Sequence, residues 1–183
     1  MAHPSPYAGI VLAAGEGQRF GGPKAPFVVN GERLVDHSVR IVREAGLDPV
    51  IVVLGAWVGD VPDCETVVNP YYRAGIGSSL ISAITYAQTT YPHLEGVIIT
   101  LVDLPDLLPS TVKLVCDEPA PLVQARCNGQ PGHPVKIDAI YFDELLESVH
   151  GDSGAKEFLT AHNVAYIDVD DHGSVADLDF QPR

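Results

Sequence analysis

Residues 7–24 read YAGIVLAAGEGQRFGGPK, an apolar run followed by a glycine-rich loop. The apolar run is typical of a strand that is buried on both faces of a parallel sheet. The loop contains four glycines within eight residues and two cations, Arg19 and Lys24. Glycines let backbone N–H groups approach an anion, and the cations add positive charge where phosphate oxygens would lie. Ligands of doubly wound sheets bind at the carboxyl ends of strands, so a phosphate site is expected here.

Two common phosphate loops do not fit this stretch. A Walker loop requires Gly-Lys followed by Ser or Thr, whereas Lys24 follows a proline and precedes an alanine. A dinucleotide-binding fingerprint requires a third glycine where Phe20 stands, after Gly15 and Gly17. The loop is therefore either a phosphate loop of another type or a turn in which the glycines only redirect the chain.

The rest of the chain alternates between short β-branched runs and helical periodicity. Further strands are expected at residues 50–54, 96–102 and 164–169. Helices are expected at residues 34–45, 78–88, 109–115, 139–149 and 155–162. Asn128-Gly129 predicts a hairpin turn between residues 122–125 and 134–137. The sequence therefore predicts one α/β domain over residues 1–183: a Rossmann-like, mostly parallel sheet with helices on both faces and a late antiparallel hairpin insertion.

Composition excludes several classes of function. The 183 residues carry 11 basic and 24 acidic side chains, a net charge of −13. Nucleic acids and anionic membranes require a basic face, so neither is an expected partner. The longest apolar run, residues 50–58, is too short to span a bilayer, and the first residues lack the basic region of a signal peptide. Three cysteines without CxxC spacing favour neither a zinc site nor a disulfide framework, so a cytoplasmic location is expected.

The order of motifs along the chain resembles that of a known family. The glycine loop resembles the signature of nucleotidyltransferases that activate sugars, isoprenoid precursors and molybdopterin, which implies the nucleotide-diphospho-sugar transferase type of fold. The later motifs are similar to those of the molybdenum cofactor cytidylyltransferase family of NTP transferases. They are Asn69, Gly75-Ile76-Gly77-Ser78-Ser79, Val102-Asp103-Leu104-Pro105, Gly132-His133-Pro134-Val135 and Gly151-Asp152-Ser153-Gly154-Ala155-Lys156.

This resemblance implies transfer of a nucleoside monophosphate from an NTP to molybdopterin or its molybdenum form, with release of pyrophosphate. Ala14 matches the cytidylyl branch, so CTP is the expected donor and GTP the alternative. The implied catalytic residues are Arg19, Lys24 and Asp103. The implied nucleotide contacts are Leu12, Ala13, Ala14, Gly15, Gly17, Lys24, Asn69, Ser78 and Ser79.

A divalent metal is expected at the end of the third strand. Asp103 stands there, where a carboxylate either holds Mg²⁺ or caps the next turn. The resemblance places the metal-binding aspartate of the family at this position. It also implies a second carboxylate near the chain end, where we expect Asp177, with Asp170, Asp171 and Asp179 as alternatives.

The expected acceptor contacts are His133, Asp152 and Lys156. His133 is implied to contact the pterin, although most single histidines are structural or exposed. Asp152 or Ser153 is expected to cap a helix whose N-terminus could bind the acceptor phosphate. Lys156 stands where the family usually has arginine, which weakens a bidentate grip on phosphate. A molybdoenzyme partner is a further implication.

Two alternatives remain. The first is cytidylyl transfer to a sugar or polyol phosphate, against which the hairpin and the Gly-His-Pro-Val motif argue. The second is a non-catalytic nucleotide-binding or cofactor-binding chaperone for a molybdoenzyme. Such a module would be expected to have lost Lys24 and Asp103, and both are present.

Overall fold

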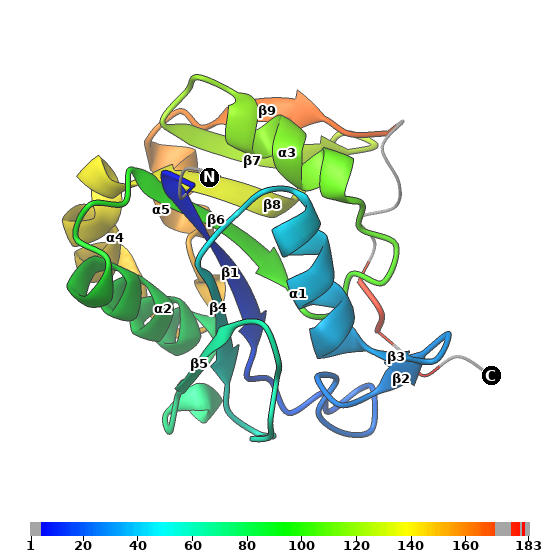
Figure 1. Ribbon diagram of the computed structural model, residues 1–183. Helices are drawn as coiled ribbons and strands as arrows, with labels where there is room; N and C mark the ends of the chain where they lie inside the picture. Colours follow the sequence, from blue (N-terminus) through cyan, green and yellow to red (C-terminus); the bar gives the residue numbers. More distant parts are fainter. Residues whose placement is uncertain (1–4, 171–176, 180, 182–183) are drawn as a thin grey trace.

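The computed structural model describes residues 5–170, 177–179 and 181. A seven-stranded sheet in the order β5-β4-β1-β6-β8-β7-β9 forms its centre (Figure 1). The strands are β1 (Tyr7–Ala13), β2 (Val28–Val29), β3 (Glu32–Arg33), β4 (Val50–Leu54), β5 (Glu65–Val68), β6 (Gly96–Leu101), β7 (Leu122–Cys127), β8 (Gln130–Asp138) and β9 (Ala165–Asp168). β2 and β3 pair separately with each other. The predicted fold is confirmed, because β5, β4, β1 and β6 are all parallel.

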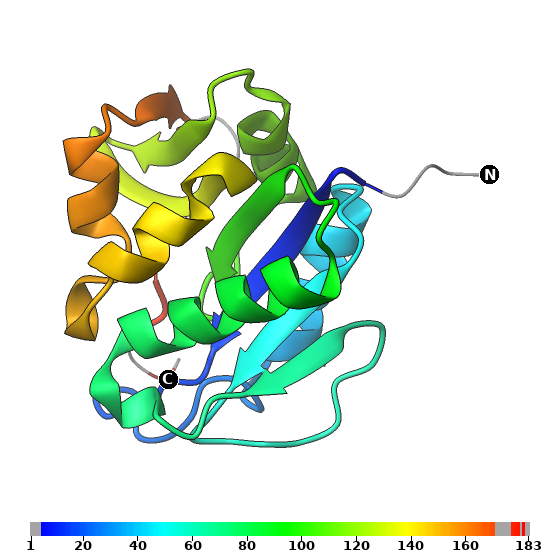
Figure 2. The ribbon, with the colours of Figure 1, turned by 90° about the vertical axis from the view of Figure 1, so that its left-hand side faces the viewer.

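Helices cover both faces of the sheet. α1 (Leu34–Glu44) and α3 (Pro109–Asp117) lie on one face, and α2 (Ile76–Thr90), α4 (Phe142–Ser148) and α5 (Lys156–Ala161) lie on the other (Figure 1, Figure 2). β1 lies between the two layers: Ala8 and Ile10 pack with the α2 layer, whereas Val11 and Ala13 pack with the α1 layer. Because both of its faces are buried, β1 is a continuous apolar run.

The predicted hairpin is inserted within the sheet. β8 is antiparallel to both β6 and β7, and β9 returns parallel to β7. Asn128 and Gly129 form the turn with φ of 50° and 74°, as an Asn-Gly hairpin requires. The pairing of Ile99 with Val135 places the Gly-His-Pro-Val motif beside the end of β6. The motif is therefore carried to the sheet edge at which β1 and β6 end.

Several local predictions differ from the structure. The predicted helix at residues 139–149 begins as a 3₁₀ turn, η2 (Ala139–Tyr141), before α4. Residues 151–153 form another, η3 (Gly151–Ser153), and a third, η1 (Tyr72–Ala74), precedes α2. α5 begins only at Lys156 and has no side-chain cap, so neither Asp152 nor Ser153 caps it. The edge strand β5 was not predicted: Val67 packs against the core, but none of its four residues is fully buried. Within the described ranges, no helix is both long and apolar enough to cross a membrane.

Candidate active site

The glycine loop turns back on itself at Gly17, the first of three loop glycines with positive φ. Gly17 has φ of 60°, and its carbonyl accepts the N–H groups of Gly21 at 2.8 Å and Gly22 at 3.1 Å. A Cβ at Gly17 would lie 1.9 Å from the Gly22 oxygen, so a larger residue cannot keep this turn. Phe20, which stands where a dinucleotide fingerprint needs glycine, is buried and packs edge-on against Phe27. The loop is thus anchored at Phe20 and folded back at Gly17.

Gly17→Ala tests this loop geometry. A residue with a Cβ in a left-handed conformation costs about 1–2 kcal/mol, and the close Gly22 oxygen forces a further rearrangement. We therefore expect binding of an NTP to weaken by about tenfold or more, since 1.4 kcal/mol is tenfold. Isothermal titration calorimetry measures the affinity. Gly31→Ala is the matched control, because Gly31 also has a positive φ of 85° but lies in the β2–β3 turn with open space around it. Equal affinity for both variants would contradict the role of Gly17.

An ion pair lies where β1 and β6 end. The Lys24 ammonium donates to Asp103 Oδ2 at 2.6 Å, and each side chain is only 16% exposed. The two residues are 79 positions apart, and the parallel pairing of β1 with β6 brings their loops together. The other carboxylate oxygen, Asp103 Oδ1, is buried and has no hydrogen-bond partner within the described residues. A buried carboxylate oxygen without a partner is costly, so this atom is suited to receive a ligand.

Residues near the chain end lie against Asp103. The Leu178 N–H donates to the Asp103 carbonyl at 2.9 Å, which brings Asp177 to the site. Burial, together with the nearby Asp103 carboxylate, raises the pKa of Asp177. Asp179 pairs with Arg19 at 3.5 Å, and Arg19 is 77% exposed. Asp170 instead accepts the Asn128 N–H at 2.6 Å, at the hairpin turn.

The aspartates considered as the second metal ligand lie at different places in the structure. Asp177 lies beside Asp103, and Asp170 is engaged at the hairpin. Asp171 lies outside the described residues. The described part of the chain contains no group of three or more His, Cys, Asp or Glu side chains arranged for a metal. A cation here would therefore depend on few protein ligands, as Mg²⁺ sites that also use substrate phosphates do.

The start of α2 forms the opposite wall of the site. The helix begins at Ile76, two residues before the predicted start, with Gly75 as its N-cap residue at φ of 103°. Asn69 is 1% exposed, and its amide donates to Ser78 Oγ at 2.8 Å and to Ser79 Oγ at 3.1 Å. These predicted nucleotide contacts therefore bond to one another. Ser79 lines the cavity, whereas Asn69 and Ser78 brace the helix start from behind.

A cavity of about 300 Å³ occupies the space between loop and helix. Half of its described lining residues are predicted nucleotide contacts: Leu12, Ala13, Ala14, Gly15, Gly17, Lys24 and Ser79. The predicted metal ligand Asp103, just after β6, lines the same cavity. Arg19 lies outside it, in a smaller hollow with Lys24 and Asp179. Tyr72 lines the cavity and was missed, because nothing in the Tyr-Tyr pair at residues 71–72 indicates which ring faces inward.

The predicted acceptor residues line a continuation of this cleft. A second cavity of about 180 Å³ shares Leu12 and Asp152 with the first, and it shares His133 and Lys156 with a third of about 700 Å³. Burial lowers the pKa of His133 to about 4, and the Asp103 charge offsets this only in part. His133 is therefore neutral near pH 7, and its imidazole has one donor and one acceptor nitrogen.

Two lining residues of the larger cavity were missed by sequence reasoning. Gln124, on β7, donates from Nε2 to the Gly132 carbonyl at 3.1 Å, next to His133. Tyr166, on β9, is 42% exposed and lines the same cavity. Both belong to strands of the inserted hairpin region, and their alternation along a strand gives no sign of a ligand. The cleft thus joins a loop-lined cavity with cationic Lys24 to a larger one with mixed polar groups.

Comparison with known proteins places this chain in a family. Residues 9–166 match the MobA-like NTP transferase domain. Nicotine blue oxidoreductase of Paenarthrobacter nicotinovorans is 32% identical over 93% of this chain and 91% of its own. A probable molybdenum cofactor guanylyltransferase of Opitutus terrae is 48% identical over 57% of this chain and 51% of its own.

Solved structures agree with this placement. The crystal structure of Rv0371c from Mycobacterium tuberculosis H37Rv has a TM-score of 0.79 and 26% identity, over 97% of this chain and 95% of its own. A further crystal structure of Rv0371c is a complex with manganese. The region that matches the family runs from β1 through Lys24 and Asp103 to β9, and so includes the whole cleft except its C-terminal residues. The chain belongs to the family of MobA-like NTP transferase domains.

Proposed function

We propose that this protein transfers a nucleoside monophosphate from an NTP to a phosphorylated pterin, molybdopterin or its molybdenum form. Membership of the MobA-like family makes it a nucleotidyltransferase. In the proposed reaction, a phosphate oxygen of the acceptor attacks the α-phosphorus, and a new P–O bond forms. The bond from the α-phosphorus to the bridging oxygen of the β-phosphate breaks, and that oxygen leaves with pyrophosphate. The observation that carries the proposal is the Lys24–Asp103 pair at the end of the glycine-loop cavity.

The residues of the loop would position the triphosphate and stabilise its charge. Lys24 is half-buried and fixed by Asp103, so its ammonium is held where phosphate oxygens would lie. Arg19 is exposed, and its weak pairing with Asp179 at 3.5 Å leaves the guanidinium available to phosphate at the loop edge. No covalent enzyme intermediate is required, because positioning and charge stabilisation account for catalysis of this kind.

Asp103 and Asp177 would hold a divalent cation. The unpartnered oxygen Oδ1 of Asp103 and the neighbouring carboxylate of Asp177 fit such an ion. When bound, Mg²⁺ or Mn²⁺ supplies neutralisation of charge on the phosphate oxygens. Without a cation, the two carboxylates would repel a triphosphate. A bound cation would remove this repulsion, and so would let a chain of net charge −13 bind a polyanion.

Metal removal has a clear expected effect. With excess EDTA, pyrophosphate release should fall to background, and NTP binding should weaken strongly because Asp103 and Asp177 are then uncompensated. Coupled pyrophosphate detection and calorimetry measure the two quantities. Restoring Mg²⁺ or Mn²⁺ in excess of EDTA should restore both. Undiminished turnover in EDTA would contradict the metal assignment.

The acceptor would occupy the larger cavity. His133 and Gln124 offer neutral donors and acceptors, which suit the polar edge of a fused heterocycle such as a pterin. Lys156, at the start of α5, offers a cation for the acceptor phosphate. Asp152 lines the glycine-loop cavity and the adjoining cavity of about 180 Å³, so it would lie between the two substrates.

The donor base is the point on which motif and relatives differ. Ala14 in Leu-Ala-Ala-Gly favours CTP, whereas the Opitutus terrae relative is named a guanylyltransferase. We place GTP first and CTP second. A pyrophosphate-release screen of GTP, CTP, ATP and UTP against molybdopterin and simple sugar or polyol phosphates tests this choice. Release with molybdopterin and one NTP supports the proposal, and release only with a sugar or polyol phosphate would overturn the acceptor.

A redox function is the second candidate. It is favoured by the 32% identity to nicotine blue oxidoreductase over nearly the whole of both chains. An oxidoreductase needs an electron donor and releases no pyrophosphate. The same protein should therefore be assayed for oxidation of NADH and NADPH with a redox dye as acceptor. Oxidation of NADH or NADPH, with no pyrophosphate release for any combination of NTP and acceptor, would favour the redox function over the proposed one.

A further inference from the structure

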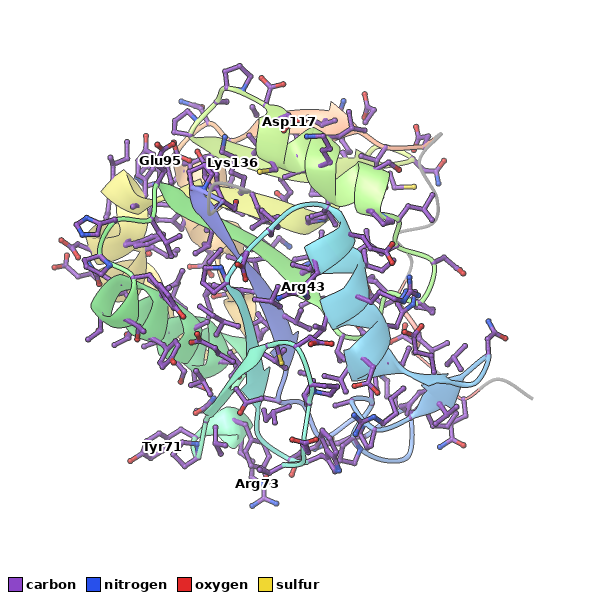
Figure 3. All side chains as sticks on the ribbon, in the orientation of Figure 1. Arg43, Tyr71, Arg73, Glu95, Asp117 and Lys136 are labelled. Atoms are coloured by element: carbon purple, nitrogen blue, oxygen red, sulfur yellow. The ribbon has the colours of Figure 1, made fainter. Side chains whose placement is uncertain are left out.

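One aromatic ring lies in the wall of the glycine-loop cavity. Tyr72 lines that cavity together with the backbone of the loop, whereas its neighbour Tyr71 is 74% exposed. Figure 3 shows Tyr71 and Arg73 at the outer edge of the molecule, directed away from the sheet. The 3₁₀ turn η1 thus presents one tyrosine to the cavity and its neighbours to solvent.

Tyr72 packs closely against Gly55 and Ala14. A Cβ at Gly55 would lie 2.7 Å from Tyr72 Cβ and 2.8 Å from Ala14 Cβ, so the turn packs directly on the end of β4 and on the loop. The Ala56 N–H donates to the Ala14 carbonyl at 3.0 Å and holds these segments together. Only glycine at position 55 permits this approach, which gives Tyr72 a rigid support.

Arg73 and Glu16 hold the ring from the solvent side. The Arg73 guanidinium lies 5.3 Å from the Tyr72 ring centroid, and Arg73 Nε donates to Glu16 Oε1 at 2.8 Å. Glu16 belongs to the glycine loop and also accepts from Gln18 at 3.2 Å. This chain of contacts runs from the loop to η1 across the edge of the cavity. The contact of Arg73 with Glu16 is exposed, so its effect is expected to be modest.

The residues proposed to bind the triphosphate provide no surface for the base of an NTP. Lys24 and Asp103 account for the charged part of an NTP, but the flat, weakly polar base needs a surface of its own. Among the described residues that line the cavity, Tyr72 alone is aromatic. Aromatic side chains bind any nucleobase through its π face. We infer that Tyr72 is the surface against which the donor base packs, and that Arg73 and Glu16 are positioning residues for its ring. This inference rests on the proposed NTP site.

Tyr72→Leu tests the inference by binding calorimetry with three probes, each with Mg²⁺. Loss of base–aromatic contact should weaken binding of GTP and CTP by about tenfold, and more for GTP because a purine offers a larger face. Inorganic tripolyphosphate, which lacks a base, should bind equally well to the variant and the wild type. Tyr72→Phe should retain NTP affinity. Tyr71→Leu is the matched control, since its ring faces solvent, and should bind all three probes as the wild type does.

The positioning role of Arg73 and Glu16 is tested separately, by GTP binding in single and double variants. Arg73→Met and Glu16→Gln should each weaken GTP binding by a few fold, and neither should have a further effect in a Tyr72→Leu background, because both act through the ring. Undiminished GTP and CTP binding by Tyr72→Leu would overturn the inference, as would an equal loss for tripolyphosphate. A wild-type protein that binds tripolyphosphate but no NTP would also overturn it. Failure of the wild type to bind any of the three probes would instead overturn the proposed function.

Discussion

Replacing Asp103 with asparagine is expected to lower the rate of pyrophosphate release by about 10²-fold or more, the cost typical of losing a group that stabilises transition-state charge. Asparagine keeps the size of the side chain and the backbone carbonyl that holds Leu178. It removes the negative charge that pairs with Lys24 at 2.6 Å, and it replaces one of the two carboxylate oxygens by an NH2 group, which does not bind a cation. The variant should therefore fold but fail to use the metal. Steady-state kinetics at varied Mg²⁺ measures both effects.

Asp106→Asn is the matched control for this variant. Asp106 lies three residues later, in the same loop after β6, but is exposed. Exposed substitutions of this kind usually change free energies by less than about 0.5 kcal/mol, so activity should stay within about twofold. Near-normal turnover and unchanged Mg²⁺ dependence in Asp103→Asn would contradict the assigned role.

Replacing Lys24 with methionine should be about as damaging, with kcat/KM lowered by about 10²-fold. Methionine keeps most of the aliphatic length but removes the ammonium that the cavity would present to the triphosphate. It also leaves the Asp103 carboxylate, 16% exposed, without its cation, which disfavours the approach of phosphate. The loss should therefore appear in KM for the NTP as well as in kcat. The measurement is a titration of NTP at saturating acceptor.

Two further variants separate catalysis from folding. Lys24→Arg keeps the charge and the partner of Asp103, so it should fold normally, but a guanidinium differs from an ammonium in shape and should restore only part of the rate. Lys113→Met removes an exposed lysine from α3 and should leave activity unchanged. Thermal unfolding checks each protein. If Lys24→Met has the unfolding temperature and the turnover rate of the wild type, Lys24 is not a catalytic residue.

The sequence predicted which residues stand at the ends of strands, but not which strands are neighbours. The apolar run of β1 and the glycine loop predicted a phosphate site, and the end of a later strand, together with the resemblance, predicted a metal-binding carboxylate at Asp103. The contact between Lys24 and Asp103 is the consequence of the pairing of β1 with β6. The Asn-Gly turn likewise predicted the hairpin that brings His133 to the same edge of the sheet.

The sequence did not indicate which side chains point into the cavity. Asn69 follows β5 and Ser79 lies in the first turn of α2, yet only Ser79 lines the cavity, because the amide of Asn69 bonds to the serines at the helix start. In the Tyr71-Tyr72 pair, the packing on Gly55 decides which ring turns inward. Among the C-terminal aspartates, Asp177 lies near the Asp103 carboxylate, because the Leu178 N–H donates to the Asp103 carbonyl. Each of these choices is made by a tertiary contact.

The fate of two labels distinguishes nucleotidyl transfer from NTP hydrolysis and from redox chemistry. GTP or CTP carrying label on the α-phosphate or on the γ-phosphate is incubated with the protein, Mg²⁺ and molybdopterin, and the products are separated. We expect the α label to move to the pterin and the γ label to leave as pyrophosphate, with both transfers slowed by about 10²-fold or more in Asp103→Asn. Release of the γ label as phosphate, or an NTP left intact while NADH or NADPH is oxidised, would contradict nucleotidyl transfer.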